Sequence, residues 1–156
     1  MSNTLDQQRA AYSLKAVDEV KEKIKKSKKD SDLEWENKGD DYAGYVVNLA
    51  GAIRVNGLGQ ALAQLLAAAK GQEEDPHLWL YRHISTWICK EHQKSRFKKQ
   101  NQTDLLRALV NEETTRKDYQ WAVVETMAFL EWHRKIAVAE LKKTDPGSEG
   151  KKNGQE

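Results

Sequence analysis

Hydrophobic side chains recur every three or four residues along most of the chain, with polar residues between them. In the first such segment, from about residue 4 to residue 26, five apolar side chains share one helical face: Tyr12, Ala16, Val17, Val20 and Ile24. A second segment begins near Asp41, and its apolar positions are Tyr42, Tyr45, Val46, Leu49 and Ile53. Both spacings are those of amphipathic α-helices.

Four more helices are predicted after the second one, which ends at Asn56-Gly57, residue types that tolerate a left-handed backbone. A third helix starts at Leu58, and Pro76 suits the first turn of a fourth. A short leucine-rich fifth helix follows. The sixth is the longest, from about residue 115 to residue 143, and its middle is apolar on two faces, so we expect it at the centre of a bundle.

No segment alternates polar and apolar residues with the period of two that is typical of a strand. The sequence therefore predicts an all-α fold, a compact bundle of about six helices with a long central C-terminal helix, in a single domain over residues 1–143. The polar runs at residues 28–41 and 93–102 lack periodicity, and we expect mobile loops there. The tail, residues 144–156, is almost without apolar anchors, so we expect it to be disordered.

The composition points to a small protein of a reducing compartment. The 156 residues suffice for one domain with one core, and only two are prolines, so long helices can run without interruption. A single cysteine, Cys89, excludes an internal disulfide. No apolar run approaches the ~20 residues of a membrane span, and the N-terminus lacks the basic-then-apolar order of a secretory signal. We therefore expect a cytoplasmic protein with no membrane contact.

The net charge of +2 does not by itself indicate a nucleic-acid partner, but the positive charges are clustered. One cluster contains Lys21, Lys23, Lys25, Lys26, Lys28 and Lys29, and the other contains Lys90, Lys94, Arg96, Lys98 and Lys99. Such clusters can bind phosphates. A lysine-rich helix end and a solvated loop explain them equally well, because the helix dipole favours positive charge at a C-terminus.

The stretch IRVNGLGQALAQL contains two glycines, as phosphate-binding loops do. A dinucleotide-binding turn requires G-x-G-x-x-G, or its alanine variant, directly after a strand. Here the glycines follow a predicted helix, the third position is the bulky Leu62, and no Gly-Lys-Ser/Thr ends the run. We therefore interpret Asn56-Gly57 as a turn between two helices, with Gly59 allowing the next helix to approach a neighbour closely.

The cysteine and histidines do not form a convincing metal or catalytic set. Cys89 and His92 lie one helical turn apart, but no second pair has zinc-ligand spacing. His77 and His83 are six residues apart and face different sides of a helix. A nucleophile pair of Cys89 with His133 lacks an oxyanion-binding loop and an orienting third group. We expect no metal, no cofactor and an inert thiol.

Glu125 is the unusual charge in the last helix, because its helical position places it between Trp121 and Trp132 on an otherwise apolar face. A carboxylate in such surroundings needs a partner. Arg54 and Arg134 are the candidates, and a structural ion pair is favoured over an acid–base catalyst.

The sequence resembles one known family, the small helical subunit of the Cmr-type (type III-B) CRISPR RNA-guided effector complex. The resemblance spans roughly Leu5 to Leu141 and is carried by Tyr42, by Tyr119, and by these blocks: Arg9-Ala10-Ala11-Tyr12, Ile53-Arg54-x-Asn56-Gly57-Leu58-Gly59-Gln60-Ala61-Leu62, and Glu125 followed by Leu130-x-Trp132-x-Arg134-Lys135-x-Ala137. The chain departs from the family pattern at Ala50, which stands where a proline is frequent, and at His133 and Ile136.

The resemblance implies a non-catalytic subunit of an antiviral defence complex. Several copies would stack beside the guide-bearing backbone and line the channel that holds the guide–target RNA duplex, with catalysis left to other subunits. The partners would be other subunits, neighbouring copies of the chain and RNA, with no small-molecule substrate. Contact would be made to the RNA backbone through charge, not to bases.

The candidate RNA-contacting residues are exposed-type cations in clusters or in the matching blocks: Arg54, Lys94, Arg96, Lys98, Lys99, Arg134, Lys135 and Lys142. The main alternative is a protein–protein scaffold module with no direct RNA contact. A ribonuclease that uses His92 or His133 is a more distant alternative.

Overall fold

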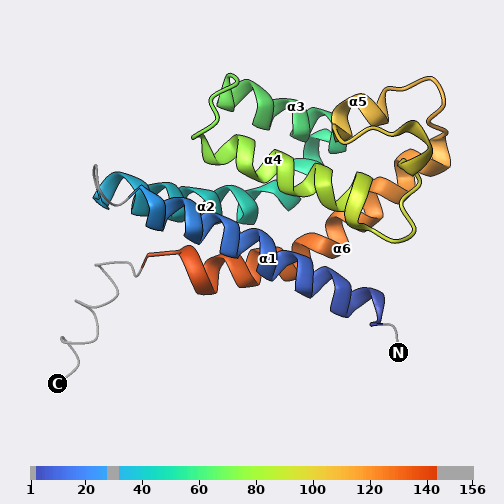
Figure 1. Cartoon of the computed structure of the whole chain (residues 1–156). Coiled ribbons are helices and arrows are strands. Elements are labelled where there is room, and N and C mark those ends of the chain that lie inside the picture. Colours follow the sequence, from blue (N-terminus) through green and yellow to red (C-terminus); the bar gives the residue numbers. More distant parts are fainter. Residues whose placement is uncertain (1–2, 28–31, 144–156) are drawn as a thin grey trace.

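The computed structural model describes residues 3–27 and 32–143, which form six α-helices and two short helical segments of other types (Figure 1). The elements in chain order are α1 (Leu5–Lys26), α2 (Asp32–Asn56), α3 (Leu58–Ala69), α4 (Pro76–Thr86), η1 (Trp87–Glu91), η2 (Lys98–Gln100), α5 (Leu105–Leu109) and α6 (Arg116–Leu141). No strand occurs within these two described ranges, and the predicted all-α fold with a long last helix is confirmed. The predictions for residues 28–31 and for the tail 144–156 lie outside the described residues.

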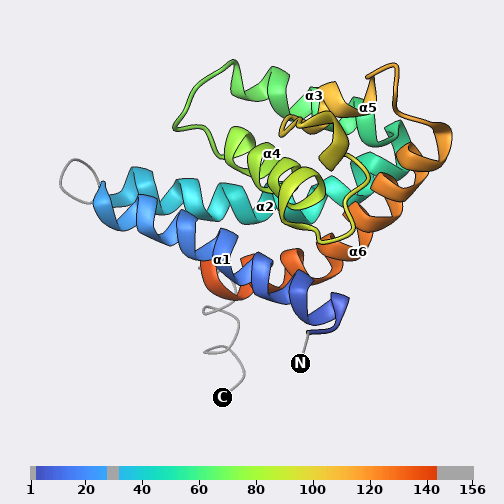
Figure 2. The same cartoon turned by 45° about the vertical axis from the view of Figure 1, so that its right-hand side comes forward.

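The helices form two groups that share α2. On one side α1 and α2 run antiparallel and α6 packs against both of them (Figure 1). On the other side α4 packs on α2 and α3, and the short α5 contacts α3 and α4 (Figure 2). The long α6 is therefore covered along its middle by α1 and by α2, as its two apolar faces predict.

The core fills the space where these elements meet. Its largest fully buried side chains are contributed by different elements: Trp87 from η1, Tyr42 from α2, Phe129 from α6 and Phe97 from the segment between η1 and η2. Phe97 is 0% exposed, so the segment at residues 93–102, expected from its polarity to be a plain loop, inserts an aromatic anchor into the core.

α2 begins at Asp32, nine residues before the helix start expected at Asp41, so the predicted loop at residues 28–41 is wrong from residue 32 onward. The first turns of α2 lack apolar periodicity, and contacts with other helices hold them in place. Trp35 stacks on Trp79 with ring centroids 6.2 Å apart. Gly39 is buried, and a Cβ added to it would lie 2.7 Å from Cδ1 of Ile24, so helix contact here uses the absence of a side chain.

The joint between α2 and α3 is the helix–helix turn that the sequence predicts. Gly57 has φ +87° and ψ 160°, a backbone region that is essentially restricted to glycine. Its N–H donates to the carbonyl of Ile53 at 2.8 Å, which closes the last turn of α2. Gly59 donates its N–H to the hydroxyl of Tyr119 at 3.0 Å, so the predicted close approach is to the start of α6.

α4 continues into η1, a π-helical turn that the sequence does not reveal. The N–H of His92 donates to the carbonyl of Trp87, five residues earlier, at 2.9 Å. Single π-turns are frequent at functional positions. This turn places the rings of Trp87 and His92 side by side, with centroids 5.2 Å apart, on the side of the chain that faces α6.

Candidate nucleic-acid interface

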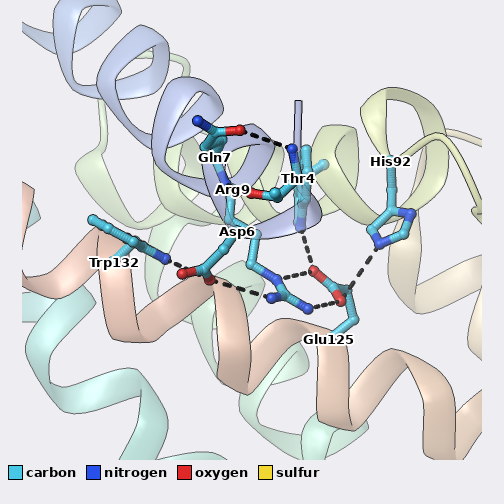
Figure 3. Close-up of polar contacts among 8 residues, drawn as sticks. Thr4, Asp6, Gln7, Arg9, His92, Glu125 and Trp132 are labelled. Atoms are coloured by element: carbon cyan, nitrogen blue, oxygen red, sulfur yellow. Dashed lines mark hydrogen bonds and ion pairs between the residues drawn. The ribbon is translucent and has the colours of Figure 1, made fainter. Parts of the chain in front are cut away.

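The carboxylate of Glu125 lies at the centre of a buried cluster between α1, η1 and α6 (Figure 3). Arg9 donates to it through Nε at 2.8 Å and through Nη2 at 2.7 Å, and Trp87 donates through Nε1 at 3.2 Å. Nε2 of His92 lies 3.4 Å from Oε2, which is long for a hydrogen bond and is best described as an electrostatic contact. We call Arg9, Trp87, His92 and Glu125 the Glu125 cluster.

The expectation that Arg54 or Arg134 pairs with Glu125 is wrong. Arg54 is exposed in the last turn of α2, and Arg134 contacts Glu131 on its own helix at 3.5 Å. The actual partner, Arg9, is 116 residues away in the sequence and reaches Glu125 because α1 packs along α6. The ion pair was predictable from the apolar surroundings of Glu125, but its partner depends on this packing.

Arg9 and His92 keep Glu125 ionised. Burial acts to raise the pKa of the Glu125 carboxyl, but Arg9 and His92 outweigh it and lower the pKa to about 2. The ring of His92 is oriented at its other nitrogen, because Nδ1 accepts the N–H of Lys94 at 3.0 Å. An accepting Nδ1 places the proton of a neutral ring on Nε2, which is the atom that faces Glu125.

The N-terminal end of α1 is attached to α6 at a second point beside this cluster. Nε1 of Trp132 donates to Asp6 at 2.9 Å, and Asp6 lies 3.4 Å from Nη1 of Arg9 (Figure 3). Trp132, one of the residues that carry the family resemblance, therefore has a structural contact here. Asn56 and Gln60, which belong to the same set, are both exposed.

A second buried network runs through the hydroxyl of Tyr42 and links four helices. Ser13 contacts Nδ1 of His133 at 2.7 Å, and Nε2 of His133 contacts the Tyr42 hydroxyl at 2.7 Å. The same hydroxyl contacts Nδ1 of His83 at 2.7 Å, and Nε2 of His83 contacts Glu19 at 2.9 Å. Ser13 and Glu19, both on α1, are therefore joined through one continuous chain of polar contacts.

The three groups weighed as catalytic candidates, His92, His133 and Cys89, are buried. Desolvation by burial, together with the nearby His83, lowers the pKa of His133 to about 3, and both of its ring nitrogens are engaged in the Tyr42 network. Burial raises the pKa of the Cys89 thiol to about 12, which agrees with an inert thiol. His92 and His133 are 2% and 0% exposed, so neither ring reaches a surface where RNA could bind.

Four of the candidate cations are brought together on the segment at residues 93–102, which we call the basic loop: Lys94, Arg96, Lys98 and Lys99, all exposed. The loop is held by hydrogen bonds of its backbone and side chains. The N–H of Ser95 donates to the carbonyl of His92 at 3.1 Å, and the N–H of Phe97 donates to the Ser95 hydroxyl at 3.2 Å. Nε2 of Gln100 donates to Thr114 at 2.8 Å.

A hollow of about 400 Å³ separates the basic loop from the start of α6. Its lining residues carry both signs of charge: Ser95, Arg96, Lys99, Gln100, Glu113 and Asp118. Arg96 lies 3.4 Å from Asp118 across it. Two further exposed cations, Arg116 and Lys117, occupy the first turn of α6 next to Asp118. Sequence reasoning missed them because Glu112 and Glu113 precede them and cancel the local charge.

The other four candidate cations lie outside the basic loop. Arg54 lies at the α2–α3 joint, which contacts the start of α6 through Tyr119. Arg134 and Lys135 are exposed farther along α6. Lys142 follows its last residue and lies 3.6 Å from Asp40. With a rise of ~1.5 Å per residue, Asp118 and Lys142 are about 36 Å apart along α6.

The described residues can also be searched for metal sites and for membrane-spanning helices. Nowhere in residues 3–27 and 32–143 are three or more His, Cys, Asp or Glu side chains grouped so that they could hold a metal ion. None of the helices within these ranges is long and apolar enough to cross a membrane.

Comparison with known protein families identifies the family of this chain. The model of the family CRISPR-associated protein (Cas_Cmr5) matches residues 5–140, which is most of the chain and nearly the span over which the sequence resembles a Cmr small subunit. The chain therefore belongs to the Cas_Cmr5 family, and the resemblance to the small subunit of the type III-B CRISPR complex is confirmed.

Proposed function

We propose that this member of the Cas_Cmr5 family is a non-catalytic subunit that lines the guide–target RNA channel of the Cmr complex and contacts the RNA backbone through its basic loop. The observation that carries the proposal is the exposure of four cations within six residues of a loop whose backbone is attached to the core. Clusters of this kind supply the electrostatic part of RNA affinity.

The loop chemistry favours phosphate contact over base recognition. Phe97, the loop's aromatic side chain, is 0% exposed and offers no surface on which a base could stack. Among the described residues, Arg96 alone of the four loop cations contacts a carboxylate, that of Asp118. A contact made by charge alone suits a subunit that accompanies guide–target duplexes of any sequence.

The absence of catalysis is proposed on the burial of the candidate groups. His92, His133 and Cys89 all lie inside the core, where each packs or bonds with other side chains. The remaining partners are proposed from the family: other Cmr subunits and neighbouring copies of the chain, stacked in the cytoplasm along the guide-bearing backbone.

The test is a change of Lys94, Arg96, Lys98 and Lys99 together to alanine, in a Cmr complex assembled with the variant chain. Target-RNA affinity is measured at several salt concentrations. We expect weaker binding and a shallower dependence of affinity on salt, since each lost phosphate contact reduces the slope of log K against log salt by roughly 0.7 to 0.9.

The matched control removes the same charge outside both basic clusters, by changing Lys15, Lys70, Arg82 and Arg107 to alanine; these side chains are also exposed. The control is expected to retain the affinity and the slope. If the loop variant assembles normally and binds with unchanged affinity and slope, the RNA-contact proposal is wrong. If it fails instead to enter the complex, the loop is a protein-binding element and the scaffold alternative is correct.

A further inference from the structure

We infer that His92 is a positioning residue for RNA contact: it never touches RNA but holds the basic loop in the conformation that presents its cations. The inference rests on the proposed function of the loop and adds a residue that the family resemblance does not assign. It is drawn from the contacts of the imidazole ring, which connects the buried Glu125 cluster with the first residues of the loop.

The two ring nitrogens of His92 contact different partners. Nδ1 accepts the backbone N–H of Lys94 at 3.0 Å, which fixes the direction in which the chain leaves η1. Nε2 lies 3.4 Å from the carboxylate of Glu125. Because Glu125 is held by two hydrogen bonds from Arg9, the ring is oriented by a group that is itself fixed.

Packing holds the ring in place and removes it from solvent. The His92 ring meets that of Trp121 edge to face at 4.9 Å and lies 5.2 Å from the ring of Trp87. It is 2% exposed. A side chain in this position cannot contact a phosphate, so any effect of His92 on RNA binding must act through other residues.

Hydrogen bonds from His92 and Ser95 also hold the next residues of the loop in place. The carbonyl of His92 accepts the N–H of Ser95, and the Ser95 hydroxyl accepts the N–H of Phe97 at 3.2 Å while donating to the carbonyl of Cys89 at 3.3 Å. The ring of Phe97 then lies 6.2 Å from that of Trp121. Lys94, Arg96 and Lys98 alternate with these attached residues, so their side chains start from fixed backbone positions.

Fixing the loop before binding matters because ordering a flexible segment on binding opposes association. If the first residues of the loop were released, the cations would remain but would have to be ordered by the RNA. Affinity should then fall while the number of phosphate contacts, and with it the salt dependence, stays the same. Loss of the cations themselves changes both quantities.

The test is His92→Phe in the assembled complex, which keeps an aromatic ring but removes both nitrogens and leaves Glu125 paired with Arg9. We expect roughly tenfold weaker target-RNA binding with an unchanged salt slope, the loss that preorganisation of a few residues accounts for. Trypsin should cleave the free variant chain faster at Lys94, Arg96, Lys98 and Lys99, with fragments identified by mass spectrometry. Far-UV circular dichroism should stay unchanged.

Two further variants make the result specific. His92→Asn can still accept the N–H of Lys94 through its Oδ1, so it should recover most of the affinity and the trypsin resistance. His77→Phe is the matched control, because His77 is half-buried and stacks on Tyr45, distant from the loop in the sequence. It should leave both measurements unchanged.

The outcomes separate this inference from the function on which it rests. If the fourfold loop variant binds RNA weakly but His92→Phe binds as tightly as the natural chain, the loop function stands and the role of His92 is wrong. If His92→Phe does not fold, His92→Asn is used to test the inference. An RNA affinity of His92→Asn as low as that of the fourfold loop variant contradicts the inference. If the fourfold variant binds normally, the RNA-contact proposal fails and His92 has no RNA contact to position.

Discussion

Glu125 shows how a single charged side chain can join distant parts of a helical core. It is 4% exposed, yet its carboxylate accepts hydrogen bonds from Arg9 and Trp87 and lies 3.4 Å from Nε2 of His92. A buried charge of this kind is costly once its partner is removed, because the remaining ion is left without solvent or counter-charge. The pair Arg9–Glu125 is therefore expected to be coupled in stability.

Arg9→Met should lower the free energy of unfolding by about 3 kcal/mol, the cost of leaving a buried carboxylate unpaired. The double variant Arg9→Met, Glu125→Leu should lose clearly less than the sum of the two single variants, since both charges leave together. Urea unfolding followed by circular dichroism measures all four proteins. Strictly additive losses would show that the two residues do not interact.

His133 predicts a dependence of stability on pH. Its pKa is lowered to about 3 in the folded chain and is about 6.5 when unfolded, so the unfolded chain takes up a proton first as the pH falls. Stability from this group is complete above pH 6.5 and is lost as the pH falls toward 3. Between pH 7 and pH 5 the loss should be on the order of 2 kcal/mol.

The check is the free energy of unfolding of the natural chain and of His133→Gln at pH 7 and at pH 5. The variant should be less stable at pH 7 but should lose about 2 kcal/mol less between the two values. Glu125 does not disturb this window, because the stability from its depressed pKa is lost only below about pH 4.5. An equal loss in both proteins would contradict the assignment.

At the scale of single residues, the sequence indicates which side chains are unusual but not which side chains they contact. Glu125 stands out because tryptophans flank it in the helical pattern, whereas Arg9 belongs to a helix more than a hundred residues away. Ser13 is 0% exposed and begins the Tyr42 network, yet its polar side chain gives no sign of burial in the first helix. Both depend on how α1 lies on α6.

At the scale of elements, the joint after α2 can be tested with two glycines of the same segment. Gly57→Ala should lower the free energy of unfolding by about 1–3 kcal/mol, because φ +87° with ψ 160° is unfavourable for any side chain. Gly51→Ala should raise it by about 0.5–1 kcal/mol, because Gly51 is in the interior of α2 with nothing within 4 Å of an added Cβ.

The two changes add the same methyl group six residues apart, so each controls for the other in one thermal or urea unfolding experiment. A similar effect of both would show that the backbone of Gly57 is not restricted as described. The turn itself was predictable, since Asn-Gly after an apolar helical stripe is a local signal.

The start of α2 was not predictable, because no local sequence signal marks it. Helix signals in the sequence come from repeated apolar side chains, and residues 32–41 have few. Here the helix is held by Trp35 on Trp79, by the missing side chain of Gly39, and by Asp40, which accepts the N–H of Lys143 at 2.9 Å. The partners lie in α4, in α1 and just after the end of α6, and tertiary contacts of this kind override local propensity.

At the scale of the whole molecule, the candidate cations are spread along the length of α6. The basic loop is beside its first turns and Lys142 follows its end, about 36 Å away. A single RNA can meet both only if it is at least that long. At ~2.8 Å per base pair of an A-form RNA duplex, this corresponds to roughly thirteen base pairs.

Lys142→Ala should therefore weaken binding of the isolated chain to a duplex of about twenty base pairs by a few-fold at low salt. It should leave binding to a duplex of about six base pairs unchanged. The fourfold loop variant should weaken both. Fluorescence anisotropy with labelled RNA measures these affinities, and an equal effect of Lys142→Ala on both lengths would show that the two regions are not spanned by one RNA.

The sequence predicts the fold and the family of the molecule, but not where its candidate cations lie. The all-α fold follows from periodicity, and the family follows from the blocks around Gly57 and Trp132, which the match over residues 5–140 confirms. The placement of the eight cations does not follow from either, because it depends on where the helix ends lie in space. The four loop residues are close in the sequence, and the structure leaves all four exposed on one loop.

The π-turn of η1 has a consequence for the evolution of this family. It contains one residue more than an α-helical turn, and each residue rotates a helix by about 100°. If the same residues formed a regular α-helix, His92 would be turned by about 100° relative to Trp87 and so away from Glu125. The π-turn is therefore expected in relatives that have the histidine five residues after the tryptophan, as here, whereas a relative with one residue fewer can place the same ring with a regular helix.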